Sequence, residues 1–417
     1  MSIWHINGGR KLQGACFVQG AKNAALPIMA ASILCPAQTE LLNVPRIADV
    51  SNTLNILRGL GCDAAQNGGD VNIDSTGLNS STIPRILMEG MRSSVIFLGA
   101  LLARCGEARI SMPGGCNLGA RPIDLHLAAL RAMGAEITDS DGEIVCYAHE
   151  LHGAHIQFPI PSVGATENAM LAACAAKGET IIENAAREPE IVDLQEYLHC
   201  LGAEIGGAGT GKIVISGFSP EKRVGHRIIP DRIVCATLLC AAAATGGEVE
   251  LRGVQPEHFS TVTHLLNEAG CAIITTGHST RLVSEGYLRG VGAVSTGPYP
   301  GFPTDAQPLL MAALLKAKGT TDFTENIFEN RFRYVEELRR FGANVIAGGR
   351  HATLTGVDSL HGASVTAADL RGGAAMILAG LAAEGETSVY DGGYVARGYD
   401  GLDSVLRGLG ADIRFET

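Results

Sequence analysis

The sequence of 417 residues lacks a continuous apolar run of about 18 residues, and its first segment, "MSIWHINGGRKLQG", contains no apolar signal core. We therefore expect a soluble, cytoplasmic protein without a membrane-spanning helix. Basic runs and basic helix faces are also missing: 32 Lys and Arg stand against 43 Asp and Glu, which gives a net charge of −11. This balance disfavours binding to nucleic acid or to a membrane surface.

The eleven cysteines are odd in number and form no CxxC pair, which disfavours disulfides and a metal site. Buried, reduced thiols are expected for those within or next to apolar segments: Cys35, Cys62, Cys105, Cys174, Cys200, Cys235, Cys240 and Cys271. Cys116 differs because "MPGGCNLGARP" surrounds it with glycines. Arg121 and the helix start after it could activate this thiol as a nucleophile or proton donor. The alternative is a cysteine that fills a small turn pocket.

Aromatic residues make up only 5% of the chain, whereas there are 53 glycines, which indicates many tight turns. Six of these glycines mark a repeat, because each ends a similar amphipathic segment such as "LRGLG" or "LRRFG". They are Gly61, Gly134, Gly202, Gly270, Gly342 and Gly410. Each fits the left-handed residue after a helix, with a helix and a strand upstream and a strand pair downstream. We predict six α/β units of about 70 residues, longer than most solenoid repeats, arranged as two domains of three.

A glycine-rich stretch, "GGAGTGK" at residues 206–212, comes close to the phosphate-binding loop pattern. Ile213 stands where that loop needs Ser or Thr, and a strand pattern follows where a helix is required. The stretch is therefore predicted to be a hairpin turn.

Charged residues recur at matched places in the units, near the starts of both helices. Those at the second helix are Asp49, Arg121, Glu190, Glu257, Arg331 and Arg397, and the first-helix set is Lys22, Arg92, Thr166, Arg232, Asp305 and Arg371. Helix N-termini with adjacent Lys or Arg favour anions, so we expect a multiply anionic ligand; the alternative is solvated surface charge.

Asp305, in "FPTDAQP", could act as a general base toward a hydroxyl or simply cap a helix, and the sequence leaves both readings open. His126 and His155 lack metal-ligand spacing and are expected to pack rather than to catalyse.

With these residues in hand, the chain closely resembles the UDP-N-acetylglucosamine enolpyruvyl transferases (1-carboxyvinyltransferases) of the enolpyruvyl transferase family. The resemblance covers essentially the whole chain and is carried by "KLQGACFVQGAKNAALP", "PGGCNLGARPIDLH", "SVGAT", "TIIENAAREPEIVDL", "IPDRIV", "FPTDAQ", "FENRF" and "ADLRGGAA".

The resemblance implies a two-domain inside-out α/β barrel with three repeats per domain. One domain would span residues 22–229, the other residues 1–21 plus 230–417, with the active site in the cleft between them. The implied reaction transfers the enolpyruvyl group of phosphoenolpyruvate to the 3′-hydroxyl of UDP-N-acetylglucosamine and releases phosphate. This is the first committed step of bacterial peptidoglycan synthesis, and it needs no metal or organic cofactor.

The resemblance also implies roles for individual residues. Cys116 would protonate the methylene carbon and be alkylated by fosfomycin-type epoxides, Asp305 would take the hydroxyl proton, and Lys22 would face the phosphate. The remaining substrate contacts would be Asn23, Arg92, Arg121, Pro122, Ile123, Asp124, Leu125, Ser162, Val163, Gly164, Ile327, Arg331, Arg371 and Arg397. Arginine suits such contacts because its planar fork pairs two oxygens at once.

Three stretches depart from the common family pattern. Ile160-Pro161 stands where many members have a lysine, and "RFRYV" and "YVARGY" carry Tyr334 and Tyr394 beside expected anion ligands. A divergent or catalytically silent paralogue is therefore one alternative. The sister enzyme acting on shikimate 3-phosphate is another, disfavoured by the Cys116 loop. An RNA 3′-phosphate cyclase would need a basic RNA surface that the sequence lacks.

Overall fold

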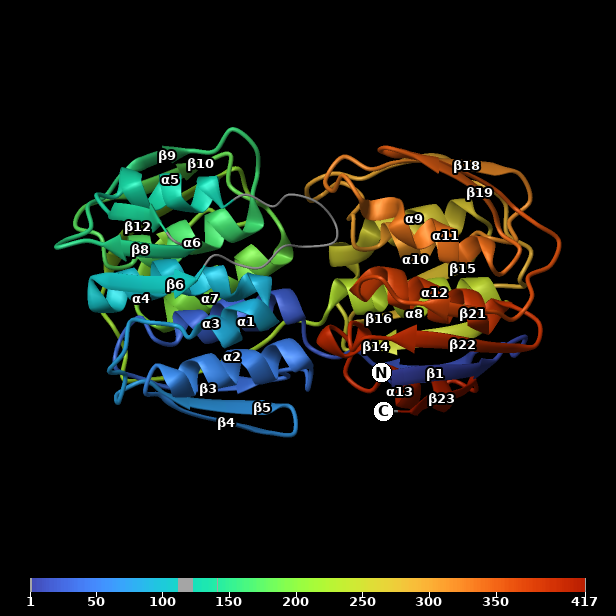
Figure 1. Ribbon diagram of the computed structural model, residues 1–417, viewed down its shortest axis with the longest axis horizontal. Helices are drawn as coiled ribbons and strands as arrows, with labels where there is room; N and C mark the ends of the chain where they lie inside the picture. Colours follow the sequence, from blue (N-terminus) through green and yellow to red (C-terminus); the bar gives the residue numbers. More distant parts are fainter. Residues whose placement is uncertain (1, 112–122, 141, 417) are drawn as a thin grey trace. The chain divides into compact units, whose positions relative to one another are not determined.

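The computed structural model describes residues 2–111, 123–140 and 142–416 (Figure 1). The chain forms two compact units, unit 1 from residues 2–19 and 230–416 and unit 2 from the described residues between 20 and 229. The first division falls between residues 19 and 20 rather than between 21 and 22. Ala21 N donates to Ile229 O at 2.7 Å within unit 2, and a Cβ on Gly20 would lie 1.7 Å from Asn43 O.

Unit 2 is a mixed α/β unit. Its helices are α1 (Lys22–Ala31), α2 (Ala48–Gly59), α3 (Arg85–Gly90), η1 (Arg92–Ile96), α4 (Phe97–Cys105), α5 (Asp124–Ala132), α6 (Val163–Ala173) and α7 (Pro189–Cys200). Its strands are β3 (Gln38–Leu42), β4 (Asp63–Asn67), β5 (Asp70–Asp74), β6 (Glu107–Ser111), β7 (Glu136–Ser140), β8 (Glu143–Tyr147), β9 (His155–Gln157), β10 (Thr180–Glu183), β11 (Ala203–Gly206), β12 (Lys212–Phe218) and β13 (Arg223–Arg227).

Unit 1 repeats this mixture of elements. Its helices are α8 (Arg232–Thr245), η2 (Pro256–Phe259), α9 (Ser260–Glu268), α10 (Gln307–Ala313), η3 (Arg331–Tyr334), α11 (Val335–Arg339), α12 (Leu370–Ala382), η4 (Val395–Arg397) and α13 (Leu402–Gly408). Its strands are β1 (Ser2–Asn7), β2 (Gln13–Phe17), β14 (Glu248–Arg252), β15 (Ala272–Thr276), β16 (Ser279–Val283), β17 (Gly292–Ser295), β18 (Thr320–Thr324), β19 (Asn344–Gly348), β20 (His351–Thr355), β21 (Ser364–Thr366), β22 (Glu386–Asp391) and β23 (Asp412–Glu416).

One sheet pattern recurs through the described residues: an edge strand runs parallel to a first strand, and two antiparallel strands complete the sheet. Unit 2 contains β13-β3-β5-β4, β9-β10-β12-β11 and β6-β8-β7, the last with a parallel bridge from Thr82 to Arg109. Unit 1 contains β2-β14-β16-β15, β17-β18-β20-β19 and β21-β22-β1-β23. In the last sheet β1 pairs with both β22 and β23, so the two ends of the chain meet in one sheet (Figure 1).

The six repeat glycines lie as predicted at the ends of helices with left-handed backbones. Their φ angles are +97° at Gly61, +94° at Gly134, +106° at Gly202, +110° at Gly270, +89° at Gly342 and +96° at Gly410. Residues 206–212 join β11 to β12 as a hairpin, which confirms that "GGAGTGK" is a turn.

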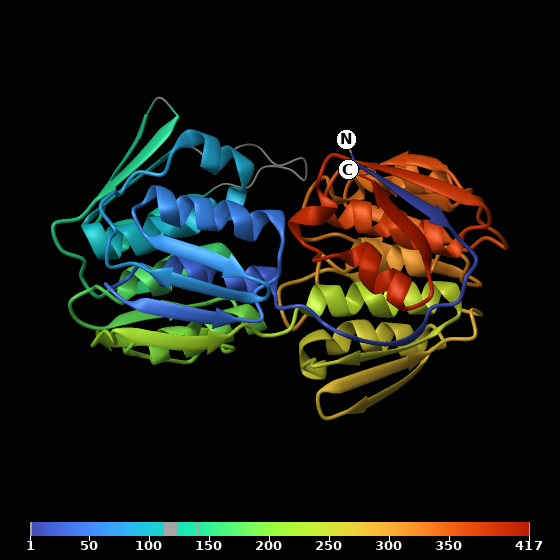
Figure 2. The ribbon, with the colours of Figure 1, turned by 90° about the horizontal axis from the view of Figure 1, so that it is seen from below.

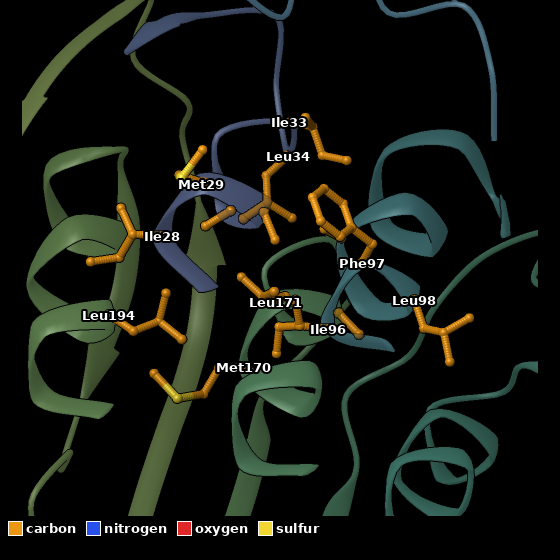
Figure 3. Close-up of a cluster of buried hydrophobic side chains, with 14 of the residues drawn as sticks. Ile28, Met29, Ile33, Leu34, Ile96, Phe97, Leu98, Met170, Leu171 and Leu194 are labelled. Atoms are coloured by element: carbon orange, nitrogen blue, oxygen red, sulfur yellow. The ribbon is translucent and has the colours of Figure 1, made fainter. Parts of the chain in front are cut away.

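The first helix of each repeat is apolar and buried on nearly every side. In unit 1, α8, α10 and α12 pack against one another, and Figure 2 shows α8, in yellow-green, running between the red and the gold strands. In unit 2, Met29 of α1, Phe97 of α4 and Leu171 of α6 lie together in the hydrophobic core of that unit (Figure 3). Burial of such side chains contributes roughly 1.5–3 kcal/mol each. None of the described helices has both the length and the apolar character needed to span a bilayer.

The cysteines follow the expectation of buried thiols with two exceptions. Cys105 and Cys200 are exposed at the last residues of α4 and α7, because an amphipathic helix turns one side to solvent there. At other positions burial raises the thiol pKa, to about 11 at Cys146 and about 12 at Cys174. The described buried thiols are therefore poor nucleophiles at neutral pH.

Candidate active site

A carboxylate held by two arginines lies at the start of α10 in unit 1. Asp305 Oδ1 accepts from Arg331 Nη2 at 2.9 Å, and its Oδ2 accepts from Arg371 Nε at 3.0 Å. The side chains of Arg331 and Arg371 are 1% and 3% exposed, whereas that of Asp305 is 29% exposed. Three charged residues from two neighbouring repeats therefore converge, and the carboxylate is the member that reaches solvent.

Arg331 is fixed on several sides. Its Nε and Nη2 donate to Thr304 O at 3.1 and 2.8 Å, and its Nη1 lies 3.7 Å from Oδ1 of Asp369. The guanidinium carbon lies 5.5 Å from the centre of the Phe328 ring. The planar fork of arginine is thus held in one orientation before any substrate arrives.

Arg371 retains hydrogen-bonding capacity. Its guanidinium lies 5.5 Å from the ring centre of Tyr399, whose hydroxyl is 2.9 Å from Thr237 Oγ1. Among the described residues, Nη1 of Arg371 has no hydrogen-bond partner although it is buried. A buried guanidinium N–H without an acceptor is costly, so this donor suits an oxygen of an anionic ligand.

The helix-cap alternative for Asp305 is wrong. Helix α10 begins at Gln307, and no side chain caps it. In the neighbouring repeat Asp369 does act as the cap, because its Oδ1 accepts from the backbone N–H groups of Arg371 and Gly372 at 3.0 Å. The carboxylate of Asp305 is instead directed to the two guanidinium groups.

Two further predicted residues of unit 1 are close in sequence to members of this cluster, Ile327 to Arg331 and Arg397 to Tyr399. Ile327 follows β18 and is 38% exposed. Arg397 lies in η4, half-buried, two residues before Tyr399. The tyrosine that Arg371 covers therefore belongs to the same short segment as Arg397.

Lys22, the first residue of α1 in unit 2, pairs with a carboxylate that the sequence prediction left without a role. Its Nζ lies 2.6 Å from Oδ2 of Asp49 in α2, with side-chain exposures of 12% and 2%. Asn23 beside it is exposed. The sequence did indicate Asp49 by its place at the start of the second helix of its repeat, which is the place that Arg331 and Arg397 take in other repeats.

Two predicted substrate-contact segments, at the starts of α5 and α6, meet through His126. Ile123 is buried, Asp124 is exposed and Leu125 is half-buried at the start of α5, and Ser162, Val163 and Gly164, all half-buried, open α6. A Cβ on Gly164 would lie 2.8 Å from Cε1 of His126, so the ring packs directly on that turn.

Asn168 fixes the His126 ring. Its Oδ1 accepts from Gly99 N at 2.7 Å, which leaves its Nδ2 to donate to Val95 O at 3.1 Å and to His126 Nδ1 at 2.7 Å. His126 is 8% exposed, which agrees with the packing role expected for it. The packing expected for His155 is wrong: this residue is exposed at the start of β9, and its Nε2 lies 3.2 Å from Oε2 of Glu183.

A group of acidic residues lies next to this turn. Glu167 of α6 is 7% exposed, and burial, followed by the charges of Glu190 and Glu188, raises its pKa well above the usual value. The apolar pattern of α6 gave no sign that a carboxyl group is buried here.

Some predicted site residues lie outside the described residues: Cys116, Arg121 and Pro122 are among residues 112–122. Arg92 begins η1. In the described residues, no group of three or more His, Cys, Asp or Glu is arranged to hold a metal ion. A cavity of about 560 Å³ in unit 1 is lined by Ser260, His264, Val294 and Phe302, among others, and contains none of the predicted site residues.

Comparisons with known proteins agree on one group of enzymes. The family model of EPSP synthase (3-phosphoshikimate 1-carboxyvinyltransferase) matches residues 6–406. The chain is 48% identical to UDP-N-acetylglucosamine 1-carboxyvinyltransferase of Geotalea uraniireducens, over 98% of both chains. It is 47% identical to UDP-N-acetylglucosamine 1-carboxyvinyltransferase 2 of Caldanaerobacter subterraneus, over 99% of both.

Two solved structures are similar over nearly the whole chain. The enolpyruvyl transferase NikO from Streptomyces tendae superposes with a TM-score of 0.89 at 26% identity, covering 100% of this chain and 99% of that one. EPSP synthase from Acinetobacter baumannii gives a TM-score of 0.75 at 20% identity, covering 100% of both chains, which is a likeness of fold alone.

Proposed function

The chain belongs to the EPSP synthase family, and within it we propose that it transfers the enolpyruvyl group of phosphoenolpyruvate to the 3′-hydroxyl of UDP-N-acetylglucosamine, releasing phosphate. The observation that carries the proposal is the 48% identity, over 98% of the chain, to a relative named for that activity. The sister reaction on shikimate 3-phosphate is not favoured, since EPSP synthase from Acinetobacter baumannii is only 20% identical.

The arginines suit a substrate that carries both a phosphate and a carboxylate. Lys22, Arg92 and Arg121 would hold the phosphate of phosphoenolpyruvate, and Arg331, Arg371 and Arg397 would take its carboxylate or the nucleotide diphosphate. The buried Nη1 of Arg371 supports this assignment, because an anionic oxygen would satisfy it.

Two groups would move protons. Asp305 and Ile327 would contact the sugar. Asp305 would accept the proton of the 3′-hydroxyl, and its 29% exposure supports access from solvent. Cys116 would give a proton to the methylene carbon, and the hydroxyl oxygen would attack the oxocarbenium-like centre that forms. The tetrahedral adduct would then lose phosphate and a methyl proton to give the enol ether.

The nucleotide would lie along the starts of α5 and α6. Arg121, Pro122, Ile123, Asp124 and Leu125 would contact it from one side, and Ser162, Val163 and Gly164 from the other. The N-terminus of α6 supports binding of the diphosphate, because its N–H groups and positive dipole end attract anions.

The finer architecture is part of the same proposal. We infer that each unit is a three-repeat inside-out α/β barrel, supported by its three sheets of one strand order around buried helices. The proposed reaction is the first committed step of bacterial peptidoglycan synthesis in the cytoplasm, and it needs no cofactor.

The test is phosphate release by the purified protein, followed by mass analysis of the product. We expect release with phosphoenolpyruvate and UDP-N-acetylglucosamine together, and none with shikimate 3-phosphate as the acceptor. Absence of release with the UDP-sugar would overturn the proposal.

A further inference from the structure

Glu325 is a fully buried carboxylate that none of the roles above uses. It follows β18 directly and is 0% exposed. Its Oε1 accepts from the backbone N–H groups of Ile327 and Phe328 at 2.8 and 3.0 Å, and its Oε2 accepts from Thr304 Oγ1 at 3.0 Å. Within the described residues, no lysine or arginine forms an ion pair with this carboxylate.

A buried carboxylate without a cationic partner destabilises the folded state unless hydrogen bonds offset its lost hydration. Burial of a carboxylate removes its hydration, and hydrogen bonds from neutral donors offset that loss only when they are well placed. All three donors are within 3.0 Å, and they come from two segments that are far apart in the chain. The carboxylate therefore acts as a tether between residues 304 and 327–328.

The tether links Thr304, the neighbour of Asp305, to Ile327. Thr304 immediately precedes Asp305, and its carbonyl accepts two hydrogen bonds from Arg331. Arg331 in turn reaches Asp305 and covers the Phe328 ring at 5.5 Å. Glu325, Thr304, Arg331 and Phe328 are therefore joined in a ring of contacts, in which Glu325 binds both Thr304 and the backbone of Phe328.

Asn326 also fixes the segment of residues 325–328, through contacts with Ser295 and Thr296. Its backbone N–H donates to Thr296 Oγ1 at 2.9 Å, and its Nδ2 donates to Thr296 O and Ser295 Oγ, each at 2.9 Å. Asn326 anchors the segment to β17 and the residue after it, while Glu325 connects it to Thr304, the residue before Asp305.

We propose that Glu325 is a positioning residue that sets the spacing between Asp305 and Ile327, and through it the place of the sugar acceptor. This inference rests on the proposed function, in which those two residues contact the sugar. Loss of the tether would act on UDP-N-acetylglucosamine more than on phosphoenolpyruvate.

The experiment compares E325A, E325Q and the control E329Q, which changes an exposed glutamate of the same segment, 3.9 Å from Arg350. For E325A we expect KM for the UDP-sugar to rise about 10- to 100-fold while KM for phosphoenolpyruvate stays within about 2-fold. E325Q should recover most of this loss, because its amide oxygen can still accept from the two backbone N–H groups. E329Q should match the wild type.

A second pair of variants covers the case in which E325A does not fold. T304V removes the hydroxyl that Oε2 accepts from, and T304S retains it. The inference expects T304V to raise KM for the UDP-sugar and T304S to restore it. Equal changes in both KM values, or a loss of thermal stability with both KM values unchanged, would overturn the inference.

Amide hydrogen exchange separates failure of this inference from failure of the proposed function. Without substrate, the amides of Ile327 and Phe328 should exchange faster in E325A than in E329Q. Exchange at equal rates overturns the tether. A wild-type protein without turnover overturns the proposed function, while the exchange rates still decide whether Glu325 holds the segment.

Discussion

The ammonium nitrogen of Lys22 lies 2.6 Å from Oδ2 of Asp49, and the carboxylate is almost entirely shielded from solvent. The carboxylate holds one end of a long, flexible side chain in place. It also joins α1 to α2, so the direction of the ammonium group depends on the packing of two helices. A lysine held in this way can meet a phosphate without first losing conformational freedom.

Asp49→Asn should lower kcat/KM for phosphoenolpyruvate about 10- to 100-fold and destabilise the protein by about 3 kcal/mol, because the Lys22 ammonium, only 12% exposed, loses the charge of this carboxylate. Steady-state kinetics and urea unfolding measure both effects. Asp412→Asn is the matched control, since Asp412 pairs with Arg10 at 2.8 Å on the surface. That change should stay within about 0.5 kcal/mol. Equal changes in kcat/KM and in unfolding free energy for the two variants would contradict a role of Asp49 in the site.

Arg371→Lys keeps the charge but loses the planar fork that serves Asp305 and Tyr399. We expect kcat/KM to fall about 100-fold or more, with a raised KM for phosphoenolpyruvate. Arg407→Lys is the control, because Arg407 pairs with Asp403 at 2.7 Å on an exposed helix face. Wild-type kinetics for Arg371→Lys would show that a point charge is enough and that the second N–H has no acceptor in the complex.

Cys116 is tested through the proton that it is proposed to donate. Cys116→Ser should be severely impaired, because a hydroxyl gives up its proton far less readily than a thiol. Cys116→Asp should keep activity and resist alkylation by fosfomycin-type epoxides, which mass spectrometry of the intact protein detects. Full activity of the serine variant would contradict the role of proton donor.

Ile160 is 62% exposed, two residues before the serine that caps α6. Ile160→Lys should lower KM for UDP-N-acetylglucosamine about 3- to 10-fold at low ionic strength, because it adds a cation beside the proposed diphosphate site. Added salt should reduce the gain, and KM for phosphoenolpyruvate should not change. Ile86→Lys, on an isoleucine that is 77% exposed in α3, controls for added charge. The same gain in both variants would argue against a nucleotide site at α6.

Glu167 predicts a pH dependence of stability. Its folded pKa is raised, so above the ordinary value the folded state binds more protons than the unfolded state, and stability falls as pH rises toward the folded pKa. Glu167→Gln removes this dependence. Its unfolding free energy relative to the wild type should therefore increase between pH 4 and pH 8 in urea titrations. Glu196→Gln, on an exposed glutamate of α7, should show no such trend. A constant difference for Glu167→Gln would contradict the buried carboxyl.

Local features were predictable from the sequence because backbone sterics determine them. Glycines such as Gly202, at φ +106°, occupy a conformation that other residues adopt at a cost, so their spacing indicates the ends of helices. The hairpin at 206–212 was predictable for a similar reason, since a strand followed it. These signals depend on a few neighbouring residues.

Contacts between distant segments were not predictable in the same way. Asp305 satisfies the pattern of a helix cap, and only its contacts with Arg331, 26 positions later in the same repeat, and with Arg371 of the next repeat decide where its carboxylate points. The hydrogen bond from Thr304 to Glu325 spans twenty-one positions and depends on two segments folding against each other. Side chains that act through such partners carry no local signature.

The pairing of β1 with β22 and β23 has a consequence for synthesis of the chain. Residues 20–229 are made in one stretch, so unit 2 can bury its core while the rest is still being translated. The first two strands belong to unit 1, and β2 finds its partner in β14 whereas β1 must wait for β22. At about 5 to 20 residues per second, the stretch after residue 229 takes roughly 10 to 40 s to emerge. Unit 1 therefore closes last, around β1, a strand that is made before the whole of unit 2.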